Sequence, residues 1–147
     1  MTTDRRVESA RQALRVVFGV VPLLAGLDKF FNVLADWPRY LSPAAQAILP
    51  ISAGTFMHLA GVVEMAVGLA ILTRWTVLGS YVAAAWLVAV AVNLVAARFL
   101  DVAVRDLVMA TAAWALARLT EAHESARAVA GSPAEARHDP TPFGKVA

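Results

Sequence analysis

The chain has 147 residues, of which 59% are hydrophobic and only 16% are charged, whereas about a quarter is usual in soluble domains. Its length fits one domain, and a mean hydropathy of +0.63 indicates that lipid is its main solvent. The absence of cysteine excludes a disulfide scaffold, a thiolate metal site and thiol chemistry on this chain. The arginines are scattered without a basic face, which excludes nucleic acid as a partner.

The N-terminal part predicts a charged cytoplasmic segment, residues 1–13, followed by a first membrane helix over residues 15–35. An apolar run after an arginine-rich start is also typical of a cleaved signal peptide. The residues that follow the run, however, are Asp28 and Lys29 instead of a small-residue cleavage site and a polar segment. A membrane helix is therefore the preferred interpretation.

The connection over residues 36–55 carries Trp37, Tyr40 and three prolines, a composition typical of an interfacial segment whose rings lie at the level of the lipid headgroups. A short helix over residues 43–49 fits within it. A second membrane helix is expected over residues 56–73, with the single ionisable residue Glu64 inside it.

The third membrane helix, residues 75–97, is the clearest, because its last 22 residues are uncharged and a bilayer core of about 30 Å needs roughly 20. A fourth helix is expected over residues 102–119, with Arg105 and Asp106 inside it. The tail, residues 120–147, is predicted to prolong this helix to about Ala130 and then to be disordered.

These elements predict an all-α, integral membrane four-helix bundle over residues 14–119, a multi-pass protein of the cell membrane. With the N-terminus inside, nine arginines and lysines lie on the cytoplasmic side and four on the outer side. Positive charge favours the cytoplasmic side, so both termini are expected to be cytoplasmic.

The ionisable residues inside the predicted bundle define the candidate site. Lys29 shares a helix face with Gly19, Pro22 and Gly26, and Glu64 lies between Gly61 and Gly68 on a similar face. Small residues allow two helices to approach closely in lipid, so the lysine and the glutamate should meet. A cluster of groups at similar depth in the outer half of the bundle is the site hypothesis: Lys29, Glu64, Asn93, Arg105, Asp106 and Asp28.

A purely structural role for these charges stays open, since intramembrane ion pairs can fix helix register and Lys29 or Arg105 can extend to the interface on flexible stems. Asn93 alone is more often an interhelical hydrogen-bonding group, and Trp86 is by default apolar bulk. Three widely spaced histidines make a metal or haem site unexpected.

Three pieces of the sequence resemble the DoxX-like family of small four-helix membrane proteins, over about residues 14–119. They are Gly26-Leu27-Asp28-Lys29-Phe30, the pattern Gly61-x-x-Glu64-x-x-x-Gly68-x-x-Ile71, and the pair Arg105-Asp106. The first piece is closest to the DoxD branch, known as the membrane subunit of a thiosulfate:quinone oxidoreductase. Other members are membrane partners of soluble redox proteins, and many have no assigned activity.

The resemblance implies a bacterial inner-membrane subunit of a redox complex with quinone as cofactor. Lys29, Arg105 or Asn93 would donate to quinone carbonyls or hold a small anionic substrate, and Glu64 would relay protons as the catalytic carboxyl. The electron donor must then be a substrate or another subunit. A non-catalytic anchor that docks a soluble redox protein is the alternative, and a small-anion carrier is a third hypothesis. The oligomeric state, including a homo-oligomer, stays open.

Overall fold

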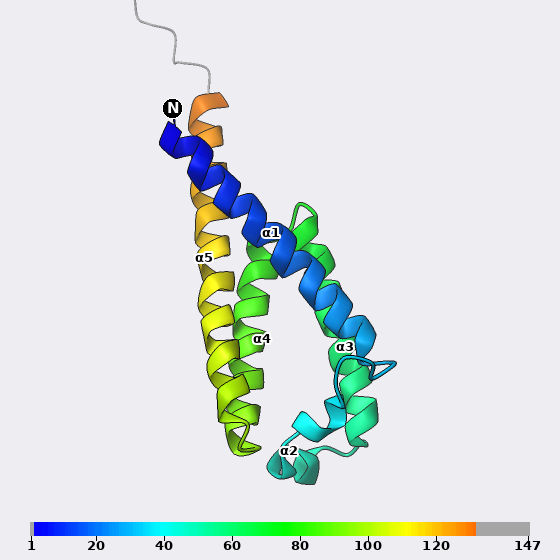
Figure 1. The fold of residues 1–147 in the computed structure, drawn as a ribbon. Helices are drawn as coiled ribbons and strands as arrows, with labels where there is room; N and C mark the ends of the chain where they lie inside the picture. Colours follow the sequence, from blue (N-terminus) through cyan, green and yellow to red (C-terminus); the bar gives the residue numbers. More distant parts are fainter. Residues whose placement is uncertain (1, 132–147) are drawn as a thin grey trace, which may run out of the picture.

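The computed structural model describes residues 2–131, and every regular element in that part of the chain is helical (Figure 1). Four long helices are joined by short connections and by one longer crossover that carries a 3-10 turn and a short helix. In chain order they are α1 (Thr2–Asp28), η1 (Trp37–Tyr40), α2 (Pro43–Ile48), α3 (Ala53–Leu72), α4 (Thr76–Ala96) and α5 (Leu100–Gly131).

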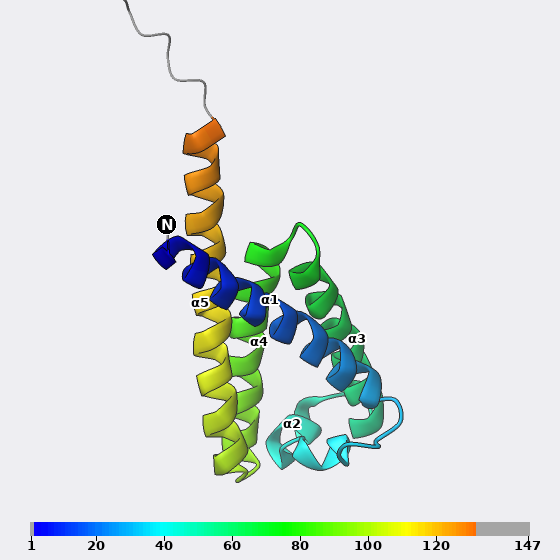
Figure 2. The same ribbon diagram turned by 45° about the horizontal axis from the view of Figure 1, so that its top comes forward.

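The four long helices form two pairs, because α1 packs along α3 and α4 packs along α5. The pairs lie together near the α3–α4 turn and diverge toward the opposite end, where η1 and α2 lie between them (Figures 1 and 2). The start of α1 and the end of α5 lie toward the same end as the α3–α4 turn.

The α1–α3 pair is held by backbone contact at glycines, as the small-residue faces predicted. A Cβ added to Gly26 would lie 2.5 Å from the carbonyl oxygen of Gly61, and one added to Gly68 would lie 2.5 Å from that of Gly19. No side chain other than hydrogen fits between the two backbones at these crossings. Close approach of backbones is what packs helices where lipid provides no hydrophobic driving force between them.

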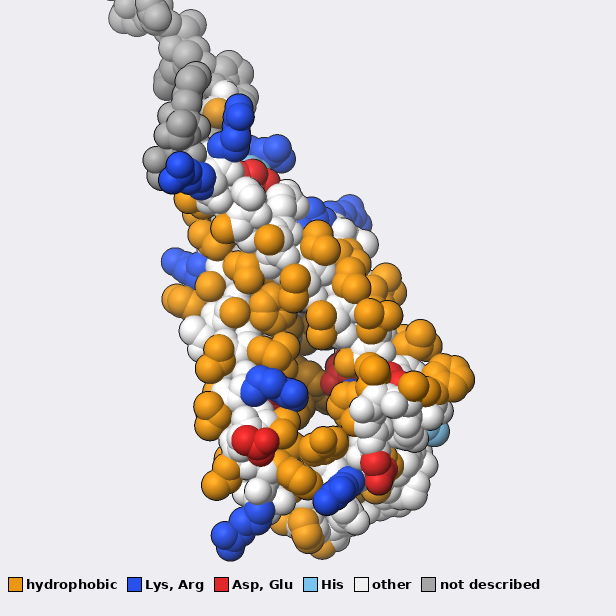
Figure 3. Space-filling model, viewed as in Figure 1, with side chains coloured by type: hydrophobic (Ala, Val, Ile, Leu, Met, Phe, Trp, Pro, Cys, Tyr) orange, Lys and Arg blue, Asp and Glu red, His pale blue; other side chains and the backbone are white. Residues whose placement is uncertain are grey.

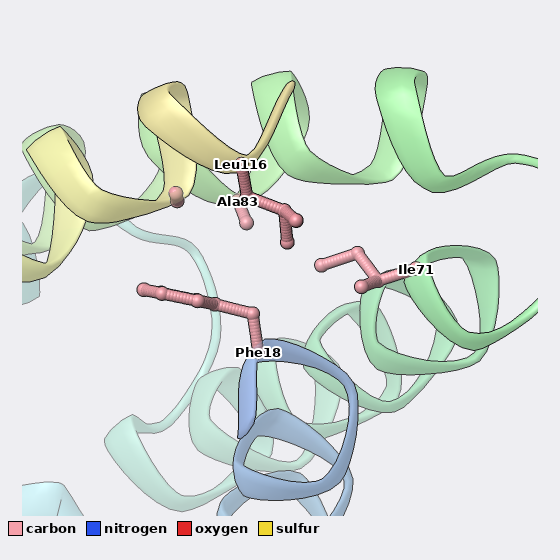
Figure 4. Close-up of a cluster of buried hydrophobic side chains, with 5 residues drawn as sticks. Phe18, Ile71, Ala83 and Leu116 are labelled. Carbon is pink, nitrogen blue, oxygen red and sulfur yellow. The ribbon is translucent and has the colours of Figure 1, made fainter. Parts of the chain in front are cut away.

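All four long helices meet in one apolar cluster next to the α3–α4 turn. Figure 4 shows Phe18 of α1, Ile71 of α3, Ala83 of α4 and Leu116 of α5 pointing toward one another, and all are buried. This cluster therefore joins the two pairs at the end where they are closest.

The α3–α4 turn is fixed by Arg15, whose guanidinium donates to the carbonyl oxygens of Ile71, Leu72 and Thr73 at 2.7–3.0 Å. The last carbonyls of a helix have no partners within it and carry partial negative charge. The Arg15 guanidinium provides donors for these carbonyls and a positive charge beside them. It therefore ties α1 to α3 at this end as well.

Within residues 2–131, three helices are long and apolar enough to cross a membrane, namely Arg5–Asp28, Ala53–Leu72 and Thr76–Ala96. Apolar side chains also cover much of the surface, as the space-filling view shows (Figure 3). Exposed apolar area of this extent is typical of contact with lipid. By length and composition these three helices agree with the predicted membrane character, whereas α5 is not among them.

The helix bounds differ from the predicted ones mainly in α1, which was expected over residues 15–35 and instead runs from Thr2, within the segment predicted to precede it, to Asp28. The Asp28 carboxylate accepts the backbone N–H groups of Val33 and Leu34, which bends the chain away from the helix axis, and Asn32 adopts a positive φ of 53°. The short helix in the crossover and the extension of the last helix to about Ala130 are confirmed. The predicted disorder falls largely on residues 132–147, outside the described part.

Candidate functional site

The expected contact between Lys29 and Glu64 is present. The Nζ atom of Lys29 lies 2.6 Å from Oε2 of Glu64, and their side chains are 6% and 15% exposed. Lys29 follows the last residue of α1 and Glu64 lies in the middle of α3, one turn from the glycine contact at Gly61. The close helix approach therefore places an ion pair where little solvent reaches it.

Two tryptophans complete this cluster, and sequence reasoning assigned neither of them to it. The ring of Trp37, in η1, lies with its centroid 3.7 Å from Nζ of Lys29. The indole Nε1 of Trp86, in α4, donates to Oε1 of Glu64 at 3.3 Å. The sequence predicts an interfacial ring for Trp37 and apolar bulk for Trp86. The four residues Lys29, Glu64, Trp37 and Trp86 are called the Lys29–Glu64 cluster below.

Asp28 lies next to this cluster but faces a different set of donors. Its carboxylate accepts the indole N–H of Trp37 at 2.7 Å and the backbone N–H groups of Val33 and Leu34. Asp28 thus shapes the chain after α1 and orients Trp37. It makes no direct contact with Glu64 among these interactions, so the structure places it behind the site instead of in it.

Arg105 is not brought into the cluster. Its side chain is 65% exposed and its guanidinium lies 3.3 Å from the carboxylate of its chain neighbour Asp106, whose side chain is only 8% exposed. Asp106 is within electrostatic range of Lys29. Of the pair on α5, the buried acid therefore faces the inside of the molecule, and the arginine that was expected to donate there does not.

Asn93 has a structural task in this arrangement. Its amide oxygen accepts the backbone N–H of Ser42 at 3.0 Å, and its amide nitrogen donates to the carbonyl oxygen of Tyr40 at 2.8 Å. The ring of Tyr40 packs against Phe99 at 5.0 Å. These contacts fasten the crossover between α1 and α3 to α4, which was the more common interpretation of an isolated intramembrane asparagine.

The surface is hollowed between the two helix pairs, and an acidic side chain is visible inside the hollow (Figure 3). The Trp86–Glu64 hydrogen bond links α4 to α3 and so crosses from one pair to the other. A separate, open apolar depression of about 340 Å³ lies on the surface after α1, lined by Leu24, Leu27, Asp28, Phe31, Val33 and Leu34. It includes no member of the Lys29–Glu64 cluster.

The Lys29–Glu64 cluster has two chemical capacities: it can donate hydrogen bonds, and it can take up and release a proton. An ammonium has three donors, of which one is used by Glu64, so Lys29 can still donate to an oxygen. A carboxylate in a site of low solvent access can take up and release a proton. Within residues 2–131, no three histidine, cysteine or acidic side chains group together as metal ligands would.

Comparison with family models, with curated proteins and with solved structures yields no match for this chain. The DoxX-like resemblance therefore remains a prediction from three sequence motifs.

Proposed function

We propose that the chain spans the membrane four times, through α1, α3, α4 and α5, with both termini in the cytoplasm. The end that holds the start of α1, the α3–α4 turn and the end of α5 also carries most of the arginines, including Arg5, Arg74 and Arg127. Positive charge of this kind is retained on the cytoplasmic side. The first part of α5, although not among the three most apolar helices, packs along α4 for its length and is carried into the membrane with it.

The absence of cysteine makes this topology directly testable. Single cysteines at Ala10 and at Ala44, both on exposed positions, report the two ends. A membrane-impermeant maleimide should label Ala44→Cys in intact cells and Ala10→Cys only after permeabilisation. Labelling in the opposite order would reverse the proposed orientation, and labelling of both in intact cells would refute the four-span topology.

The function that this geometry supports best is the handling of a membrane quinone, as the membrane subunit of a redox complex. The observation that carries it is the buried Lys29–Glu64 pair, whose carboxylate also bridges the two helix pairs through Trp86. Bound quinone would supply the redox chemistry, accepting two electrons and two protons. Lys29 would donate to a quinone carbonyl, and Glu64 would hold and deliver a proton at Oε1, the oxygen that Trp86 occupies in this structure.

The residues present fit such a ligand, although with a smaller set than the sequence predicted. Lys29 and the indole N–H of Trp86 each donate to one oxygen of the Glu64 carboxylate, and a ligand that displaces Trp86 would meet both the Lys29 ammonium and Glu64 Oε1. Arg105 is turned to the surface and Asn93 is used by the crossover, so neither is assigned to the ligand. Electrons are assigned to a substrate or to another subunit.

Binding of decylubiquinone to the protein in lipid nanodiscs tests this proposal. Lys29→Met should weaken saturable binding, followed by tryptophan fluorescence, at least tenfold, because a hydrogen bond from a charged donor contributes about 1.5–3 kcal/mol. Arg118→Met removes a cation from α5 that is 60% exposed and is the matched control. Equal affinities in the two variants would refute the proposed role of Lys29.

Glu64→Gln tests the proton step separately. It keeps the shape of the side chain and a hydrogen-bond acceptor but cannot carry the proton, so quinol formation in membranes should be lost while the folded protein stays abundant. Glu121→Gln, which changes a carboxylate paired with Tyr81 and Arg118, is the control. Unchanged turnover in Glu64→Gln would remove Glu64 from the chemistry.

A membrane anchor for a soluble redox protein is the second candidate, favoured by the polar end of the molecule. There, Glu8 of α1 accepts hydrogen bonds from Arg11 and lies 3.2 Å from His123 of α5, so two charged helix ends are tied together. Deleting residues 131–147 should release a co-purifying soluble protein from the membrane fraction. Unchanged retention and activity after that deletion would count against an anchor that acts through the tail.

A further inference from the structure

Trp37 lies between Asp28 and Lys29 and contacts both in different ways. Its Nε1–H donates to Oδ2 of Asp28 at 2.7 Å, and its ring face lies 3.7 Å from Nζ of Lys29. The ammonium therefore has two partners from different elements: the carboxylate of Glu64 in α3 and the indole of Trp37 in η1.

The two partners of Lys29 respond differently to protonation. A proton on Glu64 removes the ion pair, whereas the attraction between a cation and an aromatic face does not titrate and is strongest where water is excluded. The hydrogen bond from the indole to the Asp28 carboxylate polarises the ring toward more negative charge on its face. Asp28 carries its charge on a carboxylate held by three N–H donors, which keeps it in place.

We infer that Trp37, oriented by Asp28, is a positioning residue that keeps the Lys29 ammonium in the site while Glu64 is neutral. The inference deepens the proposed function and rests on it, because only a proton-carrying Glu64 passes through a neutral state. Without Trp37, the unpaired ammonium at the end of α1 would extend on its flexible stem to the interface.

The other charged groups near Lys29 do not replace this contact. Asp106 of α5 is within electrostatic range but is paired with Arg105. His58 of α3 stacks on Phe30 at a centroid distance of 4.8 Å and lies on an exposed position. A neutral Glu64 can still accept a hydrogen bond from Lys29 but no longer offers an opposite charge. The indole of Trp37 is then the contact that still favours a cation at this position.

The experiment uses the fact that the whole chain contains only two lysines, Lys29 and Lys145. The protein in nanodiscs is treated briefly with a water-soluble amine-acylating reagent, and peptide mass spectrometry gives the labelling rate of Lys29 relative to that of Lys145. In wild type and in Glu64→Gln this ratio should be low and similar. Adding Trp37→Leu to Glu64→Gln should raise it at least tenfold.

Matched variants separate this role from general loosening of the fold. Trp75→Leu in the Glu64→Gln background removes an exposed tryptophan from the α3–α4 turn and should leave the ratio unchanged. Trp37→Phe keeps a smaller aromatic face and loses the N–H group that Asp28 accepts, so in the Glu64→Gln background its ratio should lie between that of Glu64→Gln alone and that of the double variant with Trp37→Leu. Circular dichroism must show equal helix content in the variants compared, and Trp37→Met, which also lacks an aromatic face, is used in place of Trp37→Leu if the latter loses helix.

Two results overturn the inference. If Glu64→Gln alone raises the ratio to the level of the double variant, the ion pair is what holds Lys29. If Glu64→Gln with Trp37→Leu stays at the wild-type ratio, Trp37 does not hold it. Asp28→Asn in the Glu64→Gln background should raise the ratio several-fold, and no rise removes Asp28 from the proposal. Because no quinone is used, the decylubiquinone titration fails or succeeds independently.

Discussion

The glycine contact between α1 and α3 makes a quantitative prediction for Gly61→Ala. The added Cβ would lie 2.5 Å from the carbonyl oxygen of Gly26 and 3.2 Å from Cβ of Lys29. Ordinary van der Waals contact begins at 3.4 Å, so the two backbones must separate by about 0.9 Å at this crossing. A rigid backbone carbonyl cannot swing aside as the end of a flexible side chain could.

The expected loss of stability follows from two opposing effects. Over-packing at a tight contact typically costs about 1–3 kcal/mol, while replacing glycine by alanine inside a helix stabilises by about 0.5–1 kcal/mol. Gly61→Ala should therefore lower the free energy of unfolding by about 1–2 kcal/mol. The change should also weaken the ion pair, since Lys29 lies on the displaced segment.

Reversible unfolding in mixed micelles, with helix content followed by circular dichroism during titration with sodium dodecyl sulfate, measures this loss. Gly54→Ala is the matched control in the same helix, because its Cβ would meet only the side-chain oxygen of Ser52 at 4.0 Å. The control should unfold at the wild-type detergent fraction or above it. If Gly61→Ala unfolds together with Gly54→Ala, the backbone contact is not what holds α1 on α3.

Three further predictions address the remaining polar contacts. Arg15→Met removes the donor to three carbonyls at the end of α3 and should cost about 2 kcal/mol in the same titration, while unchanged stability would show that water replaces it. Asn93→Leu should speed amide hydrogen exchange at Ser42, with the exchange of α3 amides as the unaffected reference. Lys29→Met leaves Glu64 buried without its partner and should cost about 3–5 kcal/mol, of which Lys29→Met with Glu64→Leu should recover most; no recovery would contradict a buried unpaired charge as the cause.

The parts of the site that follow from helix periodicity could be predicted from sequence. Gly26 and Lys29 are three residues apart on one face, and Gly61 and Glu64 are three residues apart on another. Once both faces are read as contact faces, the meeting of lysine and glutamate follows from geometry alone. The ion pair at 2.6 Å confirms that step of the reasoning.

The parts that depend on how a helix is rotated or how a connection is folded could not be predicted. Arg105 and Asp106 are neighbours near the start of α5, where Asp101 is also charged, so no apolar stripe in the sequence says which of the two faces inward. Trp37 belongs to a connection whose path is set by the hydrogen bonds of Asp28, and no periodic pattern describes such a path. Trp86 lies on a helix without a polar face, so the sequence does not indicate in which direction its indole N–H points.

The two hydrogen bonds to Glu64 differ in length, and this difference indicates whether the cluster only fixes the helix register or can open to a ligand. Oε2 is held by a charged donor of its own helix pair at 2.6 Å, whereas Oε1 is held at 3.3 Å by the neutral indole of Trp86 from the other pair. Both hydrogen bonds have the carboxylate as acceptor, but the one from Trp86 has an uncharged donor and a longer distance, so it is the weaker of the two. A ligand that enters between the pairs can thus replace Trp86 at Oε1 without breaking the ion pair. Trp86→Phe, which removes that donor and keeps a smaller aromatic ring, should accordingly strengthen decylubiquinone binding severalfold, and weaker binding would show that the indole instead helps to form the site.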